Sequence, residues 1–331
     1  MRPLPPLRDV LASARVVALP LASRFRGIDV REAALVAGPQ GWSEFSPFPE
    51  YADAEASAWL AAAIDFGWNQ QPTPPRASIR VNATLPAVAP SAVAAILDRF
   101  PGCRTVKVKV AERGQDLGQD VDRVAAARDY LGDEGRLRVD ANGAWSVPDA
   151  ERAIRALAPF RLEYVEQPCA SVPQLAELRV LLAGEVAIAA DESVRKASDP
   201  LAVARAGAAD VLVIKAQPLG GIPNALRIVS AAGLPAVVSS ALDTSVGISM
   251  GAHLAAYMPE LTYDCGLGTA ALLAADVTDE PLLPVAGAIP VRRVDVSEAL
   301  LEQYAADAER TAWWLARVER CYRLLAADAT G

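Results

Sequence analysis

A strand–helix unit that recurs from residue 79 onward is the feature that most restricts the fold of this chain. Amphipathic helical patterns, as at residues 120–130, 148–158, 172–182 and 221–231, separate short apolar runs typical of buried strands. Strands that alternate with helices predict βαβ units and a parallel sheet. The eight expected strands lie at residues 79–85, 105–110, 137–141, 162–166, 186–191, 211–215, 236–240 and 261–264.

Eight such strands in a little more than two hundred residues favour a closed β/α barrel. The rival topology is a doubly wound open sheet. A dinucleotide-binding sheet of that kind carries a glycine-rich turn after its first strand. Here residues 79–85 are followed by Pro86, Ala87, Val88 and Ala89, which contain no glycine. We therefore predict the α/β barrel.

The first 78 residues follow a different pattern. Strands are expected at residues 12–21, 31–37 and 41–45, and a helix at residues 52–66. Residues 70–75 are rich in proline and glutamine and resemble a linker. This predicts a small α+β unit before the barrel. The last segment, residues 296–326, is predicted to be helical and to pack back on that unit.

Composition narrows the classes of partner. The net charge of −8 and the pI of about 4.9, without any basic stripe, argue against nucleic acid. No apolar run reaches the ~18 residues of a membrane span. The run at residues 16–21 is too short for a secretory signal. We expect a cytoplasmic protein with no membrane partner, whose four widely spaced cysteines are reduced.

The single histidine, His253, limits the acid–base chemistry open to the chain. It lies in the apolar helical stretch at residues 245–258, where a histidine is more often a packed residue than a catalyst. Mechanisms of the Ser-His-Asp or Cys-His type therefore have almost nothing to work with. Proton transfer must rely on lysines and carboxylates.

Charged and polar residues gather where the predicted strands end. In β/α barrels the carboxyl ends of the strands form the active site. The residues in question are Lys107, Lys109, Arg138, Asp140, Asn142, Glu166, Asp191, Glu192, Lys215, Ser239 and Ser240.

Three carboxylates, Asp140, Glu166 and Asp191, end three consecutive predicted strands. Neighbouring strands lie ~4.8 Å apart, so the three side chains can converge. Carboxylates that close repel one another unless a positive charge lies between them. A divalent cation with oxygen ligands, most simply Mg²⁺, meets that need.

Two lysines flank the predicted metal site. Lys109 ends the second strand and Lys215 ends the sixth, which faces the second across an eight-stranded barrel. Each can move a proton at one face of a bound substrate. Burial and a neighbouring cation bring a lysine pKa from ~10.4 toward ~7–8, where the amine acts as a base. Lys107, on the same strand face as Lys109, is such a neighbour.

Each of these residues also has a purely structural interpretation. Lys107 and Lys109 could form a solvated strand face, and Asp140 or Asp191 could cap the helix that follows. Five ionisable groups at corresponding strand ends are much harder to explain in this way, because charges are rarely buried without a role.

Together these residues resemble the muconate-lactonizing subgroup of the enolase superfamily. Gly41-Trp42-Ser43-Glu44-Phe45-Ser46-Pro47 resembles its capping domain. The resemblance implies a modified (β/α)₇β barrel at residues 79–295. It also implies an α+β capping domain at residues 1–78 that is completed by residues 296–331. The matching motifs are Lys107-Val108-Lys109, Asp140-Ala141-Asn142, Glu166-Gln167-Pro168, Asp191-Glu192-Ser193 and Lys215 with Gly220-Gly221.

Softer features resemble the lyases of that subgroup that act in menaquinone biosynthesis. They are Arg138, the short loop at residues 24–27, and the run from Ser239 to Ser245. The implied reaction is Mg²⁺-assisted syn dehydration of a small carboxylate, 2-succinyl-6-hydroxy-2,4-cyclohexadiene-1-carboxylate.

The resemblance also implies a role for each site residue. Lys109 is the base, Lys215 the opposing cation, and Lys107 tunes Lys109. The metal ligands are Asp140, Glu166 and Asp191. Arg138, Asn142 and Glu192 support the site, whereas Ser239 and Ser240 contact the succinyl chain.

Other activities remain open. N-acylamino acid racemases and cycloisomerases of the same subgroup carry the same two lysines. Dipeptide epimerases are disfavoured, because residues 263–267 lack their Asp-x-Asp motif. A non-catalytic metal-binding barrel is disfavoured, because no member of the catalytic set is missing. The sequence leaves the oligomeric state open.

Overall fold

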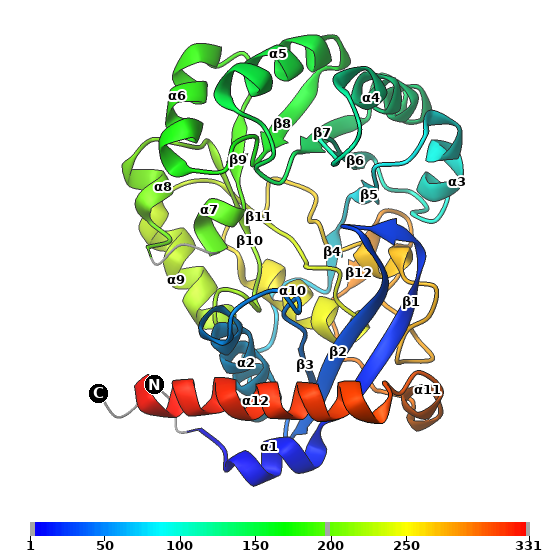
Figure 1. Ribbon diagram of the computed structural model, residues 1–331, viewed down its shortest axis with the longest axis vertical. Helices are drawn as coiled ribbons and strands as arrows, with labels where there is room; N and C mark the ends of the chain where they lie inside the picture. Colours follow the sequence, from blue (N-terminus) through cyan, green and yellow to red (C-terminus); the bar gives the residue numbers. More distant parts are fainter. Residues whose placement is uncertain (1–3, 196–198, 329–331) are drawn as a thin grey trace.

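A computed structural model describes residues 4–195 and 199–328 of the chain. Within these residues, a seven-stranded sheet has the order β11-β10-β9-β8-β7-β6-β5 and is parallel throughout. Helices surround it (Figure 1). The strands are β5 (Ala83–Leu85), β6 (Thr105–Lys109), β7 (Arg136–Asp140), β8 (Leu162–Glu166), β9 (Ile188–Ala190), β10 (Val211–Ile214) and β11 (Ala236–Val238).

The expected helices between the strands are present. The predictions at residues 120–130, 148–158, 172–182 and 221–231 correspond to α4, α5, α6 and α9 and are confirmed. Several begin at a side-chain cap, such as Ser171, which forms a capping box with Gln174. The barrel helices are α3 (Val93–Leu97), α4 (Leu117–Leu131), α5 (Val147–Leu157), α6 (Val172–Leu182), α7 (Glu192–Arg195), α8 (Ala202–Arg205), α9 (Ile222–Ala232) and α10 (Ser245–Tyr257), with short 3₁₀ turns η1 (Pro90–Ala92), η2 (Ala158–Phe160) and η3 (Thr269–Leu272).

The sheet closes differently from the prediction. The prediction of a strand at residues 261–264 is wrong. In the described residues, the barrel is closed by β-bridges of Cys265 and Gly266 instead. Cys265 bridges Val81 on one side, and Gly266 bridges Ser239 on the other. Asp264 instead uses its carboxylate to accept hydrogen bonds from side chains beneath the barrel.

The strand expected at residues 79–85 is divided in two. β4 (Ser78–Arg80) pairs antiparallel with β12 (Ala288–Pro290), and β5 joins the barrel. Asn82 lies between them and its side-chain amide donates to the Ala83 carbonyl, which competes with a regular ladder. The expected domain boundary after residue 78 falls inside β4.

The N-terminal unit is an antiparallel sheet, β1-β2-β3, with helices packed on it. The predicted strands at 31–37 and 41–45 and the helix at 52–66 are confirmed by β2, β3 and α2. The strand predicted at 12–21 begins later, because residues 7–13 are helical. The elements are α1 (Leu7–Ser13), β1 (Arg15–Phe25), β2 (Ile28–Gly38), β3 (Gly41–Phe45) and α2 (Asp53–Trp68).

The C-terminal segment packs on this unit, as Figure 1 shows for the long helix beside α2. The single helix predicted at 296–326 is in fact two, α11 (Glu298–Gln303) and α12 (Ala308–Asp328). Asp307 accepts a hydrogen bond from the Arg310 backbone N–H at 2.7 Å and so starts the second helix afresh. Trp314 is buried against Phe45 with ring centroids 5.8 Å apart. The outermost ends of the expected capping unit, residues 1–3 and 329–331, lie outside the described residues.

The histidine packs in the apolar helix, as expected. His253 is buried, its Nδ1 lies 2.8 Å from the Ser249 carbonyl oxygen, and its ring packs edge-on against Phe66. The four cysteines form no disulfide. No helix of the described chain is long and apolar enough to cross a membrane.

Candidate active site

Strand register brings the predicted charged residues to one mouth of the barrel. On β6 and β7, Lys109 is the partner of Asp140, and Asp140 is in turn the partner of Glu166 on β8. Asp191 directly follows β9, and Lys215 directly follows β10. Because side chains alternate along a strand, Tyr164 and Val213 occupy the next layer down. There they pack with Val211 and Val237 in a small apolar cluster.

Lys107 and Lys109 lie among two of the carboxylates. The Lys107 ammonium is 2.9 and 2.8 Å from the two oxygens of Glu166 and 3.4 Å from Asp140 Oδ2. The Lys109 Nζ lies 2.5 Å from the same Asp140 oxygen and donates to Asn142 Oδ1 at 2.7 Å. Lys107 is thus held by two acids, whereas Lys109 is held by one acid and one amide.

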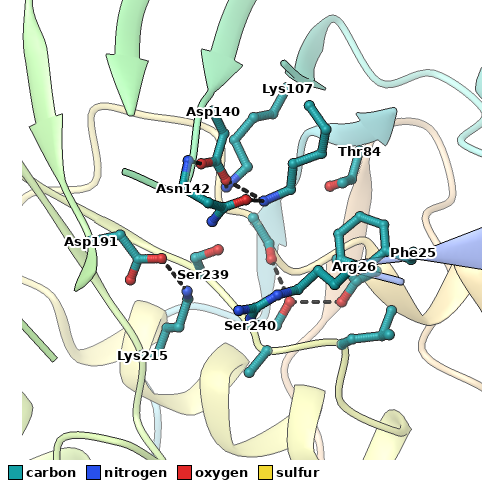
Figure 2. Close-up of a pocket in the computed structure, with 15 residues that line it drawn as sticks. Phe25, Arg26, Thr84, Lys107, Asp140, Asn142, Asp191, Lys215, Ser239 and Ser240 are labelled. Carbon is teal, nitrogen blue, oxygen red and sulfur yellow. Dashed lines mark hydrogen bonds and ion pairs between the residues drawn. The ribbon is translucent and has the colours of Figure 1, made fainter. Parts of the chain in front are cut away.

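Lys215 and Asp191 form a second pair, with Nζ 2.6 Å from Oδ2. Figure 2 shows this pair across the pocket from Lys107 and Thr84. Lys109 and Lys215 line the same cavity. The site therefore presents two separately anchored ammonium groups to one small space.

Burial and neighbouring charges set the two β6 lysines apart. Burial lowers the pKa of Lys109. The Asp140 carboxylate raises it and the Lys107 ammonium lowers it further, so the pKa of Lys109 stays below its ordinary value. Burial also opposes the charge on Lys107, but Glu166 and Asp140 together outweigh it and raise the pKa of Lys107. Lys107 is therefore a permanent cation, and Lys109 is the lysine more easily deprotonated.

The pKa values of the two neighbouring carboxylates, Glu166 and Asp140, also differ from each other. Burial, then repulsion from Asp140, raises the pKa of Glu166 to about 7. Burial likewise opposes ionisation of Asp140, yet the ammonium groups of Lys109 and Lys107 hold its pKa below the usual range. Negative charge is therefore concentrated at Asp140, and Glu166 depends on Lys107 for its ionised form.

The inner cavity has a volume of about 30 Å³. A larger outer cavity of about 290 Å³ shares Phe25, Arg26, Lys109 and Asn142 with it, so the tip of the β1–β2 hairpin borders both. The inner cavity is lined by Phe25, Arg26, Thr84, Lys107, Lys109, Asp140, Asn142, Asp191, Lys215, Ser239, Ser240, Ala241, Leu242, Gly266 and Thr269.

Three predicted residues lie outside that lining. Glu166 is fully buried behind Lys107. Arg138 lies deeper in the barrel, where its guanidinium binds Glu163 at 2.5 Å and the Asp264 carbonyl at 2.7 Å. Glu192 accepts a hydrogen bond from the Asn142 amide at 3.2 Å and so contacts the site through that residue.

Ser239 and Ser240 line the cavity as a pair with different surroundings. The Ser240 hydroxyl donates to the Gly266 carbonyl at 2.7 Å and lies 2.7 Å from Thr269 Oγ1. A Cβ on residue 266 would lie 2.5 Å from Ser239 Oγ, so a larger residue there would displace the Ser239 side chain. The closing segment of the barrel thereby fixes this wall of the cavity.

Some residues of the site were missed by the sequence analysis. Thr84 and Thr269 line the cavity but are uncharged and carry no motif. Gln167 holds the Asp191 turn, since its Oε1 accepts hydrogen bonds from the backbone N–H groups of Asp191 and Ser193 at 2.9 and 3.2 Å. Its place in the Glu166-Gln167-Pro168 motif, directly after a predicted metal ligand, was the available signal.

The three buried carboxylates of the site have the oxygen ligands that a hard divalent cation prefers. Asp140, Glu166 and Asp191 are buried carboxylates whose mutual repulsion contributes to the raised pKa of Glu166. As arranged among the described residues, however, no three His, Cys, Asp or Glu side chains form a group that could hold a metal ion. Asp140 and Glu166 share Lys107, and Asp191 pairs with Lys215 instead.

Known families match both parts of the chain. Residues 87–294 match the family described as enolase C-terminal domain-like, and residues 16–67 match the enolase N-terminal domain-like family. An o-succinylbenzoate synthase of Thermobifida fusca is 56% identical over 309 residues, covering 92% of this chain and 95% of that protein. One of Mycobacterium leprae is 52% identical over 332 residues, covering 99% and 98%.

Solved structures share the fold at lower identity. A muconate lactonizing enzyme from Pseudomonas fluorescens complexed with muconolactone has a TM-score of 0.75 at 20% identity, covering 89% of this chain and 98% of that one. An L-Ala-D/L-Glu epimerase from Bacillus subtilis has a TM-score of 0.73 at 24% identity, covering 86% and 96%. The (β/α)₇β architecture with a capping domain, expected from the sequence, is confirmed.

Proposed function

Because the chain belongs to the enolase-like family and, within it, to the o-succinylbenzoate synthases, we propose that it dehydrates 2-succinyl-6-hydroxy-2,4-cyclohexadiene-1-carboxylate to 2-succinylbenzoate. The observation that carries the proposal is the placement of Lys109 and Lys215. Both line one cavity, and each is anchored to a different buried carboxylate.

Lys109 is the proposed base. Its neutral amine takes the ring proton α to the carboxylate, and its lowered pKa makes that form more accessible. Asp140 and Asn142 hold the amine in position. The resulting ammonium then returns the proton to the departing hydroxyl on the same face. One C–H and one C–O bond break, one water leaves, and the ring becomes aromatic.

Lys215 is proposed to stay protonated throughout. It forms a short ion pair with Asp191, in which Nζ lies 2.6 Å from Oδ2. A fixed cation on the other side of the ring stabilises negative charge that develops during proton removal. Lys107 contributes a second fixed cation, because Glu166 and Asp140 hold it ionised.

Asp140, Glu166 and Asp191 are the proposed ligands of a divalent cation, Mg²⁺. With that cation bound, the site gains Lewis-acid stabilisation of the substrate carboxylate. Asn142 and Glu192 orient Lys109, Arg138 fixes the strands below, and Ser239 and Ser240 are proposed to contact the succinyl chain. We also propose that residues 79–295 form the catalytic domain and that residues 1–78 with 296–331 form the capping domain.

The decisive experiment follows the loss of cyclohexadiene absorbance by the purified protein, with Mg²⁺ and with excess chelator. Aromatic product identified by mass spectrometry in the Mg²⁺ arm supports the assignment. No turnover of this substrate under either condition contradicts it. In parallel, deuterium uptake from solvent into an N-succinyl amino acid tests the racemase alternative, which requires both lysines to exchange protons.

A further inference from the structure

The barrel holds the first half of the cavity wall after β11, at Ser239 and Ser240, whereas the capping unit holds the second half, at Ala241 and Leu242. Ser239, Ser240, Ala241 and Leu242 line the cavity in one continuous segment. We call residues 239–242 the β11 wall. Leu242 has a φ of 63°, which costs free energy for a side chain larger than glycine. Such a conformation persists only where the surroundings hold it.

Arg31 on β2 makes the contacts that hold it. Its Nε donates to the Leu242 carbonyl at 3.0 Å, and its Nη2 donates to the Ala241 carbonyl at 3.3 Å. The same guanidinium also donates to the Ser46 carbonyl beside β3. It is 1% exposed and lies 4.5 Å from the centre of the Phe48 ring. One buried side chain therefore connects two strands of the capping unit to the β11 wall.

Glu44 on β3 fixes the segment that directly follows the wall. Its Oε2 accepts hydrogen bonds from the backbone N–H groups of Thr244 and Gly247, each at 3.1 Å, and from the Thr244 hydroxyl at 2.5 Å. These N–H groups belong to the start of α10, where a carboxylate is favoured. The Ser46 hydroxyl binds the other oxygen at 2.5 Å.

The fit around Glu44 leaves no room for adjustment. A Cβ on residue 247 would lie 2.9 Å from the Glu44 carboxyl carbon and 2.7 Å from the Asp243 Cβ. Glycine at this position is what allows the carboxylate to reach the helix. Arg31 and Glu44 therefore clamp the chain on both sides of Asp243.

We propose that Arg31 and Glu44 are positioning residues for the reaction: they fix the β11 wall and thereby determine how tightly the substrate binds. Neither side chain lines the cavity, so the effect passes through the carbonyls of Ala241 and Leu242 and the first turn of α10. The proposal rests on the proposed function for its kinetic readout. It predicts that loss of either residue weakens substrate binding more than it slows the chemical step.

The test compares Arg31→Met and Arg31→Lys with the wild type in the dehydration assay. We expect Arg31→Met to raise KM about tenfold while kcat changes less than about threefold, since uniform binding is lost. A lysine lacks the two-pronged guanidinium, so the KM of Arg31→Lys should lie between those of Arg31→Met and the wild type. Glu44→Gln keeps an acceptor for the helix and should raise KM less than Glu44→Ala.

Arg317→Met is the matched control. Arg317 is also 1% exposed and also donates to two backbone carbonyls, those of Phe48 and Tyr51, neither of which lines the cavity. Its loss should lower the thermal midpoint and leave KM unchanged. Equal KM values in Arg31→Met, Arg317→Met and wild type would overturn the proposal.

A second measurement tests the clamp independently of the dehydration activity. Hydrogen–deuterium exchange over residues 239–247 should accelerate in Arg31→Met and in Glu44→Ala but not in Arg317→Met, whether or not the protein turns over the substrate. In a Leu242→Gly background, where φ of 63° costs little, Arg31→Met should raise KM less than it does in the wild type. An unchanged exchange pattern contradicts the clamp even if the dehydration activity is confirmed.

Discussion

Lys107 places its ammonium within 2.9 Å of both carboxylate oxygens of Glu166, and both side chains are buried. Lys109, two residues later, has a single carboxylate partner and a half-buried position. The Lys-x-Lys motif thus combines one lysine that is fixed as a cation with one that can give up its proton. Five predictions follow from this site and its surroundings, each in addition to the clamp experiments.

Lys109→Ala should remove the base without unfolding the chain. Loss of a positioned general base lowers the rate by about 10²–10⁴-fold, and we expect kcat to fall by at least that range. Circular dichroism should still show a folded protein, because the buried Asp140 keeps Lys107 as a partner. Normal dehydration by this variant would refute the assignment.

Lys215→Met should lower kcat strongly, and Lys215→Arg should recover part of the loss. Charge is the property proposed to matter at this position, and arginine restores it beside Asp191. If Lys215 were a second base, arginine would rescue nothing, because a guanidinium is not deprotonated near neutral pH. Single-turnover kinetics of the two variants distinguish these cases.

Lys107→Met should destabilise the fold and not only the reaction. Removing one member of a buried ion pair leaves an uncompensated charge and costs about 3–5 kcal/mol. Adding Glu166→Gln to this variant should recover part of the loss, because the nearer of the two acids that Lys107 contacted is then neutral. Urea unfolding of both single variants and the double variant measures the coupling. Additive losses would show that the two side chains do not depend on each other.

Mg²⁺ dependence should weaken in Glu166→Gln. The variant removes one anionic oxygen donor from the proposed set, so more Mg²⁺ should be needed for half-maximal activity. Metal binding by calorimetry in the absence of substrate gives an independent reading. A titration curve identical to that of the wild type would exclude Glu166 as a ligand.

Glu44 should make stability depend on pH. Burial, and then repulsion from Asp243, raises the pKa of Glu44 from 4.5 to about 7. Between these pH values the folded chain holds a proton that the unfolded chain has lost, so the free energy of unfolding falls as the pH rises and levels off above pH 7. Glu44→Gln should flatten that slope relative to wild type, whereas the exposed Glu260→Gln should not.

The charged residues of the site could be predicted because strand alternation and barrel topology place strand ends together. Lys107, Lys109, Asp140, Asp191 and Lys215 needed only the position of each strand. Which ammonium pairs with which acid could not be read from the sequence. That choice depends on side-chain reach and burial in three dimensions.

The closure of the barrel and the clamp could not be predicted either. Arg31 and Leu242 are 211 residues apart, and no local pattern relates them. Residues 261–264 have the composition of a strand, yet the chain there follows contacts of the Asp264 side chain instead. Local propensity is a weak guide where tertiary contacts of this kind decide.

Where Cys265 and Gly266 close the barrel, side-chain ion pairs add to a backbone ladder that is only two residues long. The Asp264 carboxylate binds Arg80 and Arg136 at 2.9 Å each, and both arginines are partly open to solvent. Ions barely affect the longer backbone ladders that join the other neighbouring strands, whereas exposed ion pairs such as these are screened by salt. Concentrated salt should therefore loosen the barrel first along this line, far from the chemistry at its mouth.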